Sequence, residues 1–291
     1  MKLDGATFLL QWATGGLAFL WITTRRREVS LGYGWLLRGV YGVMAAGAAA
    51  LFATQRLTAA RGLALAASIG VVGFAAVSLA LSVVRRRAGV SGRAELQAGR
   101  RARVAAMVGR NPDGGAAGGP GANAGLREFP PALDLVAPAL GKLGLLAAAV
   151  FAGGPYVLAA LRLLVGAAFL GAVSDAMLLG HWYLVQPGLR RDPVKELVRW
   201  TAIGWPFELA VFLWPTGMVQ VLNGTIDDGY HGLLGWIWVA CAVMTIGLVG
   251  LTWAALKERS YSAVMAATGL LYLAILTAFG TDLLARAVLK P

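Results

Sequence analysis

Residues that build catalytic and metal centres are scarce in this sequence. It holds one cysteine, Cys241, and two histidines, His181 and His231. A single cysteine excludes an intrachain disulfide framework and a cysteine-based metal site. The sequence also lacks the HExxH, CxxCH, GxSxG and P-loop patterns that place a zinc ion, a c-type haem, a nucleophilic serine or a phosphate. No catalytic residue and no metal ligand can therefore be named, and an enzyme acting as an isolated chain is not favoured.

Charge is scarce as well. Charged residues make up 14% of the 291 residues, and 58% of the residues are hydrophobic. A typical soluble domain carries about 25% charged residues, so the polar residues here cannot cover a water-facing globule. In a soluble protein the net charge of +12 would suggest nucleic acid as a partner. Here the basic residues lie between apolar runs, so they indicate membrane topology and no nucleic acid is expected.

Eight apolar runs can each cross a bilayer, because a helix of about 20 residues spans the hydrocarbon core. They cover residues 5–24, 33–54, 62–84, 133–153, 155–183, 200–222, 230–256 and 260–286. The fourth and fifth runs are divided at Gly153-Gly154-Pro155, because one continuous helix there would be far too long. The predicted fold is an all-α integral membrane protein, an eight-transmembrane-helix bundle.

Basic residues alternate from one connection to the next. The connections after odd-numbered spans hold eighteen lysines and arginines, whereas the other side of the membrane holds five. An excess of basic residues marks the cytoplasmic side, so both termini are predicted on the non-cytoplasmic side of a bacterial cytoplasmic membrane. The chain then divides into three spans in 1–84, a basic cytoplasmic loop at 85–131 and five spans in 132–291. The count depends on the short run at 133–153 crossing fully.

The 85–131 loop has two parts. Residues 91–110 can form a basic amphipathic helix on anionic lipid headgroups, although a solvated loop that merely obeys the topology rule fits equally well. Residues 111–125 cannot bury a core, which predicts a partly disordered loop. The expected partners are therefore the lipid bilayer with its anionic headgroups and other proteins of a membrane complex.

Asp175 and Glu208 are the strongest candidates for function, because charges inside a span are costly and rare. Each lies eight residues from the cytoplasmic end of its run, about 12 Å deep at 1.5 Å per residue. The two runs are consecutive and antiparallel, so we expect both carboxyls in one polar cluster inside the bundle. Such a pair could share a proton or hold a cation, with Arg38 or Lys142 as counter-ion. The alternative is a structural ion pair of Arg38 with either acid.

Two prolines and a histidine lie near these acids. Pro206 and Pro215 share a run with Glu208, and each removes a backbone hydrogen bond and predicts a kink. His181 lies at the cytoplasmic end of its run, where it could contact a quinone carbonyl or simply tolerate the headgroup region. His231 is expected on the opposite face of a core about 30 Å thick, so the two histidines cannot ligate one haem or metal ion.

Three functions stay open. The first is an accessory subunit of a membrane redox or respiratory assembly, with a quinone- or proton-handling site near Asp175, His181 and Glu208. The second is a small secondary transporter that uses the acids for proton or cation coupling, and the third is a structural scaffold without chemistry. The lack of a sequence repeat and of strongly broken helices weakens the transporter. The accessory subunit is favoured by elimination, and no cofactor other than a quinone suggests itself.

Overall fold

A computed structural model describes residues 4–91, 98–99, 127–186, 189–215, 217–258 and 260–289. All regular elements in these ranges are helices. In chain order they are α1 (Gly5–Thr24), α2 (Leu31–Ala53), α3 (Ala59–Val84), η1 (Arg85–Ala88), η2 (Pro131–Leu135), α5 (Val136–Ala149), α6 (Tyr156–Val185), α7 (Asp192–Leu213), α8 (Gly217–Leu222), α9 (Leu233–Ala255) and α10 (Tyr261–Val288). The amphipathic helix expected at 91–110 and the linker expected at 111–125 lie almost entirely outside the described residues.

Seven of these helical segments are long and apolar enough to cross a membrane. They are α1, α2, α3 with η1, η2 with α5, α6, α9 and α10. The short fourth run is among them, because η2 and α5 together form a segment of 19 residues. The chain also breaks between α5 and α6 at Gly153-Gly154-Pro155, as predicted. The structure therefore confirms a multi-pass helical membrane bundle.

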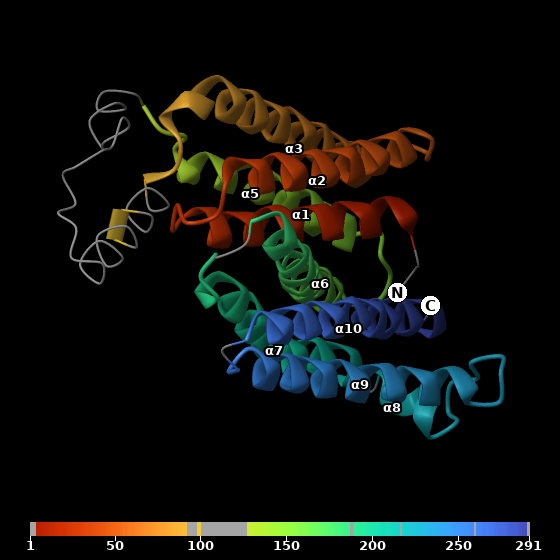
Figure 1. Ribbon diagram of the computed structural model, residues 1–291. Helices are drawn as coiled ribbons and strands as arrows, with labels where there is room; N and C mark the ends of the chain where they lie inside the picture. The colour runs from red at the N-terminus through yellow and green to blue at the C-terminus, as the bar shows by residue number, and fades with distance from the viewer. Residues whose placement is uncertain are drawn as a thin grey trace, which may run out of the picture.

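The long helices run side by side, and both chain termini lie at the same end of the bundle (Figure 1). We call this the terminal end. The connection between α1 and α2, which carries Arg25, Arg26 and Arg27, lies at the opposite end. The basic connection and the termini are thus separated by the length of the bundle, as the alternation of basic residues predicts.

Helix α6 is the most buried of the seven segments, and it packs on α1, α5, α7 and α10. Its contact with α1 is a backbone-to-backbone contact. A Cβ atom on Gly171 would lie 2.2 Å from the carbonyl carbon of Gly15, and one on Gly15 would lie 1.8 Å from the carbonyl oxygen of Ala167. Small residues allow such close approach between membrane helices. The small residues Gly15 and Gly171 therefore bring α1 and α6 into close contact.

The sixth apolar run differs from its prediction. Helix α7 begins at Asp192, eight residues before the predicted start, because Pro193 and an acidic first residue suit a helix N-terminus. It keeps Pro206 inside and ends at Leu213. Pro215 therefore ends α7, where a kink was expected, and α8 continues the run after a short break. The charged first turns of α7 are why this helix is not among the seven apolar segments.

The connection before α9 is organised by one aspartate. The Asp228 carboxylate accepts hydrogen bonds from the backbone N–H groups of Tyr230, Gly232, Leu234 and Gly235. Desolvation alone would raise the pKa of Asp228, but these four donors outweigh it and lower the pKa. The negative charge also lies at the positive end of the α9 dipole. Asp228 thus fixes where the chain re-enters the bundle.

Candidate functional site

Asp175 and Glu208 are both fully buried, on α6 and α7 respectively. Asp175 lies ten residues before the end of α6, and Glu208 lies sixteen residues after the start of α7, whose first turns are charged. The contacts of the two carboxyls place them in separate polar networks.

The Asp175 network is made with tyrosines of α2. The Tyr41 hydroxyl donates to Asp175 Oδ1 over 2.5 Å, and the Tyr33 hydroxyl donates to the Asp175 backbone carbonyl over 3.3 Å. Asp175 Oδ2 has no hydrogen-bond partner among the described residues. Gly16 leaves the space for this arrangement, since a Cβ atom there would lie 2.0 Å from Tyr41 Cζ. Asp175 is therefore a buried acid held by neutral groups, with no ion pair in the described part of the chain.

Glu208 belongs to a second network, formed with α10 and α1. The Arg286 guanidinium donates to both Asp282 oxygens, over 2.7 Å and 3.0 Å, and also to the Gln11 side-chain oxygen. Asp282 and Gln11 are fully buried, and Arg286 is 1% exposed. The Glu208 carboxyl interacts electrostatically with Asp282 and with Arg286. Within the described residues, neither Glu208 oxygen meets a hydrogen-bond donor.

Arg162 of α6 borders this second network. It interacts electrostatically with Arg286, and its side chain is buried. Its guanidinium donates to the backbone carbonyls of Val211 over 2.8 Å and of Trp214 over 3.3 Å. The Val211 carbonyl would normally accept from the N–H four residues later, but Pro215 has none. Arg162 thus satisfies the carbonyl that the proline leaves free at the end of α7.

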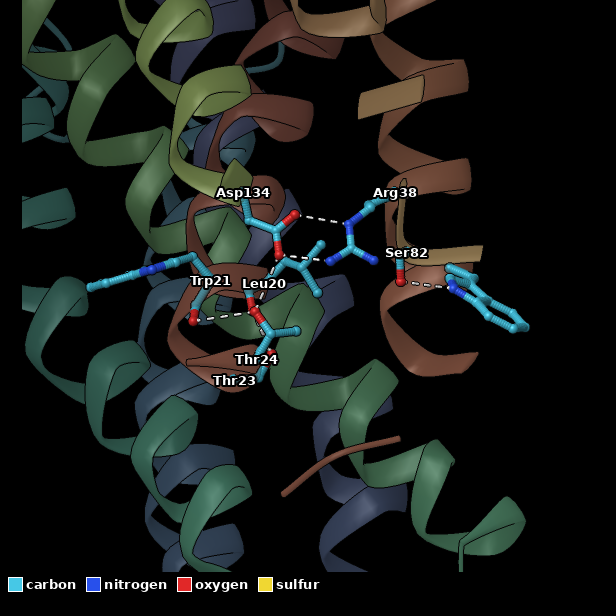
Figure 2. Close-up of polar contacts among 8 residues, drawn as sticks. Leu20, Trp21, Thr23, Thr24, Arg38, Ser82 and Asp134 are labelled. Carbon is cyan, nitrogen blue, oxygen red and sulfur yellow. Dashed lines mark hydrogen bonds and ion pairs between the residues drawn. The ribbon is translucent and has the colours of Figure 1, made fainter. Parts of the chain in front are cut away.

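Arg38 has a different partner from the expected one. Its guanidinium binds the Asp134 carboxylate through two bonds, Nε–Oδ1 of 2.8 Å and Nη2–Oδ2 of 2.7 Å. Figure 2 shows the two side chains, from α2 and η2, pointing toward each other. The Thr24 hydroxyl donates to the same carboxylate over 3.3 Å, and the guanidinium lies 4.5 Å from the Phe129 ring centre. Arg38 is therefore not a counter-ion of Asp175 or Glu208.

Two further candidates lie at the surface of the bundle. Lys142 is exposed on α5, so it is not an interior counter-ion. His181 is exposed near the end of α6, where its Nδ1 atom lies 3.2 Å from the Tyr272 hydroxyl of α10. The two rings meet edge to face. The contacts of His181 do not include Asp175 or Glu208, so the three residues do not form one site.

Gln11, Asp134 and Arg286 take part in these networks but were not singled out from the sequence, whereas Asp282 was noted only as an ionisable residue near the edge of its apolar run. Asp282 and Arg286 carry a recognisable signal, because opposite charges four residues apart lie on one face of a helix. Asp134 lies at the edge of its apolar run, where the sequence pattern predicts a loop residue. Gln11 carries no charge and gives no signal. In the described part of the chain, no group of three or more histidine, cysteine, aspartate or glutamate residues could hold a metal ion.

Comparison with protein-family models, with curated proteins and with solved structures gives no match.

Proposed function

We propose that this protein handles protons inside the bilayer, and that Glu208 and Asp282 form its proton site. The observation that carries the proposal is that two fully buried carboxyls interact electrostatically next to one arginine. Two carboxyls can hydrogen-bond to each other only when one of them holds a proton. Asp282 already accepts two bonds from Arg286, whereas among the described residues no donor reaches either Glu208 oxygen. In this proposal the proton resides on Glu208.

The broken helix beside this site supports a proton-coupled secondary transporter. Helix α7 carries Glu208 and ends at Leu213, and the run continues in α8 after Pro215. Discontinuous helices next to buried ionisable groups are a recurring feature of secondary transporters, where they let parts of the bundle move against each other. The sequence shows no strongly broken helix, which counts against a transporter. The break between α7 and α8 removes that objection.

The second candidate function is an accessory subunit of a redox assembly that contacts a quinone. His181 and Tyr272 support it, because both are exposed and lie in hydrogen-bond contact on the outer surface of the bundle. A quinone in the bilayer could reach this pair without entering the protein. Binding of a short-chain ubiquinone, compared between the parent chain and His181→Ala, tests this candidate. Equal affinity of the two proteins would eliminate it.

We further propose eight crossings in a bacterial cytoplasmic membrane, with both termini on the non-cytoplasmic side. Helices α7 and α8 together supply the eighth crossing. Two termini at one end of the bundle require an even number of crossings, and basic residues gather at the other end (Figure 1). Labelling of single cysteines at the two termini in intact cells with an impermeant reagent should modify both. Modification of only one terminus would overturn the eight-crossing topology.

A proton-flux measurement tests the proposed function. The protein is reconstituted in liposomes that enclose a pH-sensitive dye, and a potential that is negative inside is imposed. We expect proton entry above the rate of empty liposomes, and a decrease of about tenfold or more in Glu208→Gln, in line with loss of a buried proton carrier. Asp227→Asn is the matched control, because Asp227 is an exposed acid outside the network. Equal flux through Glu208→Gln and the parent protein would contradict the proposal.

A further inference from the structure

A cavity of about 190 Å³ opens at the terminal end of the bundle, between the start of α6 and the break after α7. Arg162, Gly217, Gln220 and Ile226 are among the residues that line it, and no described lining residue is acidic. One water molecule occupies about 30 Å³ in the liquid, so the cavity has room for a group of several heavy atoms. Its size and its lining suit a small anionic group.

Arg162 supplies the charge in this cavity. Its side chain is only 8% exposed, and its described partners are backbone carbonyls, which carry no full charge. No carboxylate forms an ion pair with it in the described part of the chain. The neighbouring Arg286 is already paired with Asp282, so the charge of Arg162 remains uncompensated. A buried cation in this position is stabilised by an anion in the cavity.

The backbone around Arg162 adds to the positive potential. Helix α6 begins at Tyr156, and the N–H groups of its first turn have no partner within the helix. The N-terminus of a helix this long carries a positive partial charge and often binds anions. Gly217 keeps the guanidinium accessible, because a Cβ atom there would lie 3.4 Å from Arg162 Nη2 and 1.8 Å from the Phe212 carbonyl oxygen. Gln220 offers a further amide donor.

We propose that this cavity binds a small anionic group, a carboxylate or a phosphate, through Arg162. The planar guanidinium matches both groups, since each can accept two parallel hydrogen bonds from it. The group can belong to a soluble anion that enters from the terminal side or to the headgroup of an anionic lipid. The geometry of the cavity carries this inference independently of the proton site.

If the protein is the proposed proton-coupled transporter, the cavity indicates that its substrate is a small anion; this step rests on the proposed function. When Glu208 and Asp282 share a proton, the network of Arg162, Arg286 and the two acids carries one net positive charge. The surrounding helices α1, α8 and α9 contain no charged residue, so nothing in them offsets it. An anion at Arg162 would neutralise this charge. By reciprocal linkage, anion binding then favours proton uptake and proton uptake favours anion binding.

Protection of an engineered thiol tests the anion site. Ile226→Cys, in a Cys241→Ala background, places a single thiol in the cavity wall of the full-length protein in phosphatidylcholine nanodiscs. Labelling by a membrane-impermeant thiol reagent is measured with sodium acetate, sodium phosphate or sodium chloride at equal ionic strength. We expect acetate or phosphate to slow labelling more than chloride does. The same slowing without added anion in phosphatidylglycerol nanodiscs would identify a lipid headgroup as the occupant.

Three variants make the test specific. Arg162→Gln should weaken protection about tenfold or more, because it removes a charged hydrogen-bond donor, whereas Arg162→Lys keeps the charge but not the two parallel donors and should weaken protection less. Arg56→Gln removes an exposed arginine from the connection between α2 and α3 and should have no effect. Glu208→Gln removes no positive charge and should keep protection of the thiol, although it should lower proton flux. The labelling test can therefore fail while the proton-flux test succeeds, and the reverse. Labelling that no anion slows in either lipid, or protection unchanged in Arg162→Gln, would overturn the proposal.

Discussion

Single buried side chains carry the charge chemistry of this protein, and each is satisfied in a different way. Arg38 is paired with Asp134 and Arg286 with Asp282, whereas the described partners of Arg162 are backbone carbonyls, which carry no full charge. Asp175 accepts from a tyrosine hydroxyl and has no counter-ion among the described residues. A charge in the membrane interior is expensive unless it is paired. Function is therefore best sought where an ionisable group has no full counter-charge, as at Arg162 and Glu208, whereas the Arg38–Asp134 pair holds helices together.

The Arg38–Asp134 pair should behave as a structural element. Both side chains are 3% exposed or less, so replacing Asp134 with Ala leaves an arginine buried without a partner. We expect a loss of about 3–5 kcal/mol in the free energy of unfolding, measured by denaturation in mixed micelles. Arg38→Leu combined with Asp134→Leu should recover much of that loss, because no lone charge remains.

A surface pair gives the comparison for this prediction. Glu196 contacts Arg25 and Arg26, whose side chains are both 39% exposed. Glu196→Gln should cost less than about 1 kcal/mol, since exposed ion pairs contribute little. A loss in Asp134→Ala as small as that in Glu196→Gln would show that the buried pair is not structural.

The helices themselves were largely predictable from the sequence. Runs such as 5–24 and 33–54 match α1 and α2 closely, because about 20 apolar residues must form a helix to satisfy their backbone in lipid. Helix α7 was not predicted well. Its charged first turns lie outside any apolar run, and the effect of Pro215 depends on whether Arg162 is present to bind the freed carbonyl. A hydropathy pattern shows neither the charged start of α7 nor the bond between Arg162 and the freed carbonyl.

The candidate site was only partly predictable for a related reason. Burial of Asp175 and Glu208 inside the bundle was expected because each lies within an apolar run, and the structure confirms that both are buried. Their partners did not follow, because the rotation and depth of each helix are set by packing between helices. Asp134 and Asp282 lie near the ends of their runs, where a sequence pattern does not distinguish an interior residue from a loop residue.

The close contact between α1 and α6 gives a prediction at the scale of helices. Gly171→Ala would place a methyl group against the backbone of Gly15, so the two helices must move apart. We expect a loss of about 1–3 kcal/mol in the free energy of unfolding, as for other overpacked sites.

Gly39→Ala on α2 is the matched control, because nothing lies within 4 Å of its added Cβ atom. It should be neutral or stabilising by up to about 1 kcal/mol, since alanine favours a helix. Equal effects of the two substitutions would contradict this close contact.

At the scale of the whole molecule, the polar networks divide the bundle. Arg38 lies near the start of α2 and pairs with Asp134 of η2, whereas Asp282 and Arg286 lie in the last two turns of α10. Helix α10 ends near the C-terminus, at the terminal end (Figure 1). Helix α6 carries both Asp175 and Arg162. The proposed proton site and the proposed anion cavity both lie near the break between α7 and α8, an arrangement that suits a coupled transporter.

The most direct test of this account is to detect the proton shared by Glu208 and Asp282. Infrared spectroscopy separates the C=O stretch of a protonated carboxyl from the bands of carboxylates, and exposed acids are ionised at about pH 7. The account predicts a protonated-carboxyl band in the parent protein at this pH, and loss of one component of it in Glu208→Gln. Asp175→Asn, which alters the other network, should leave that component in place. A spectrum of Glu208→Gln that keeps every protonated-carboxyl component of the parent protein would contradict the central claim.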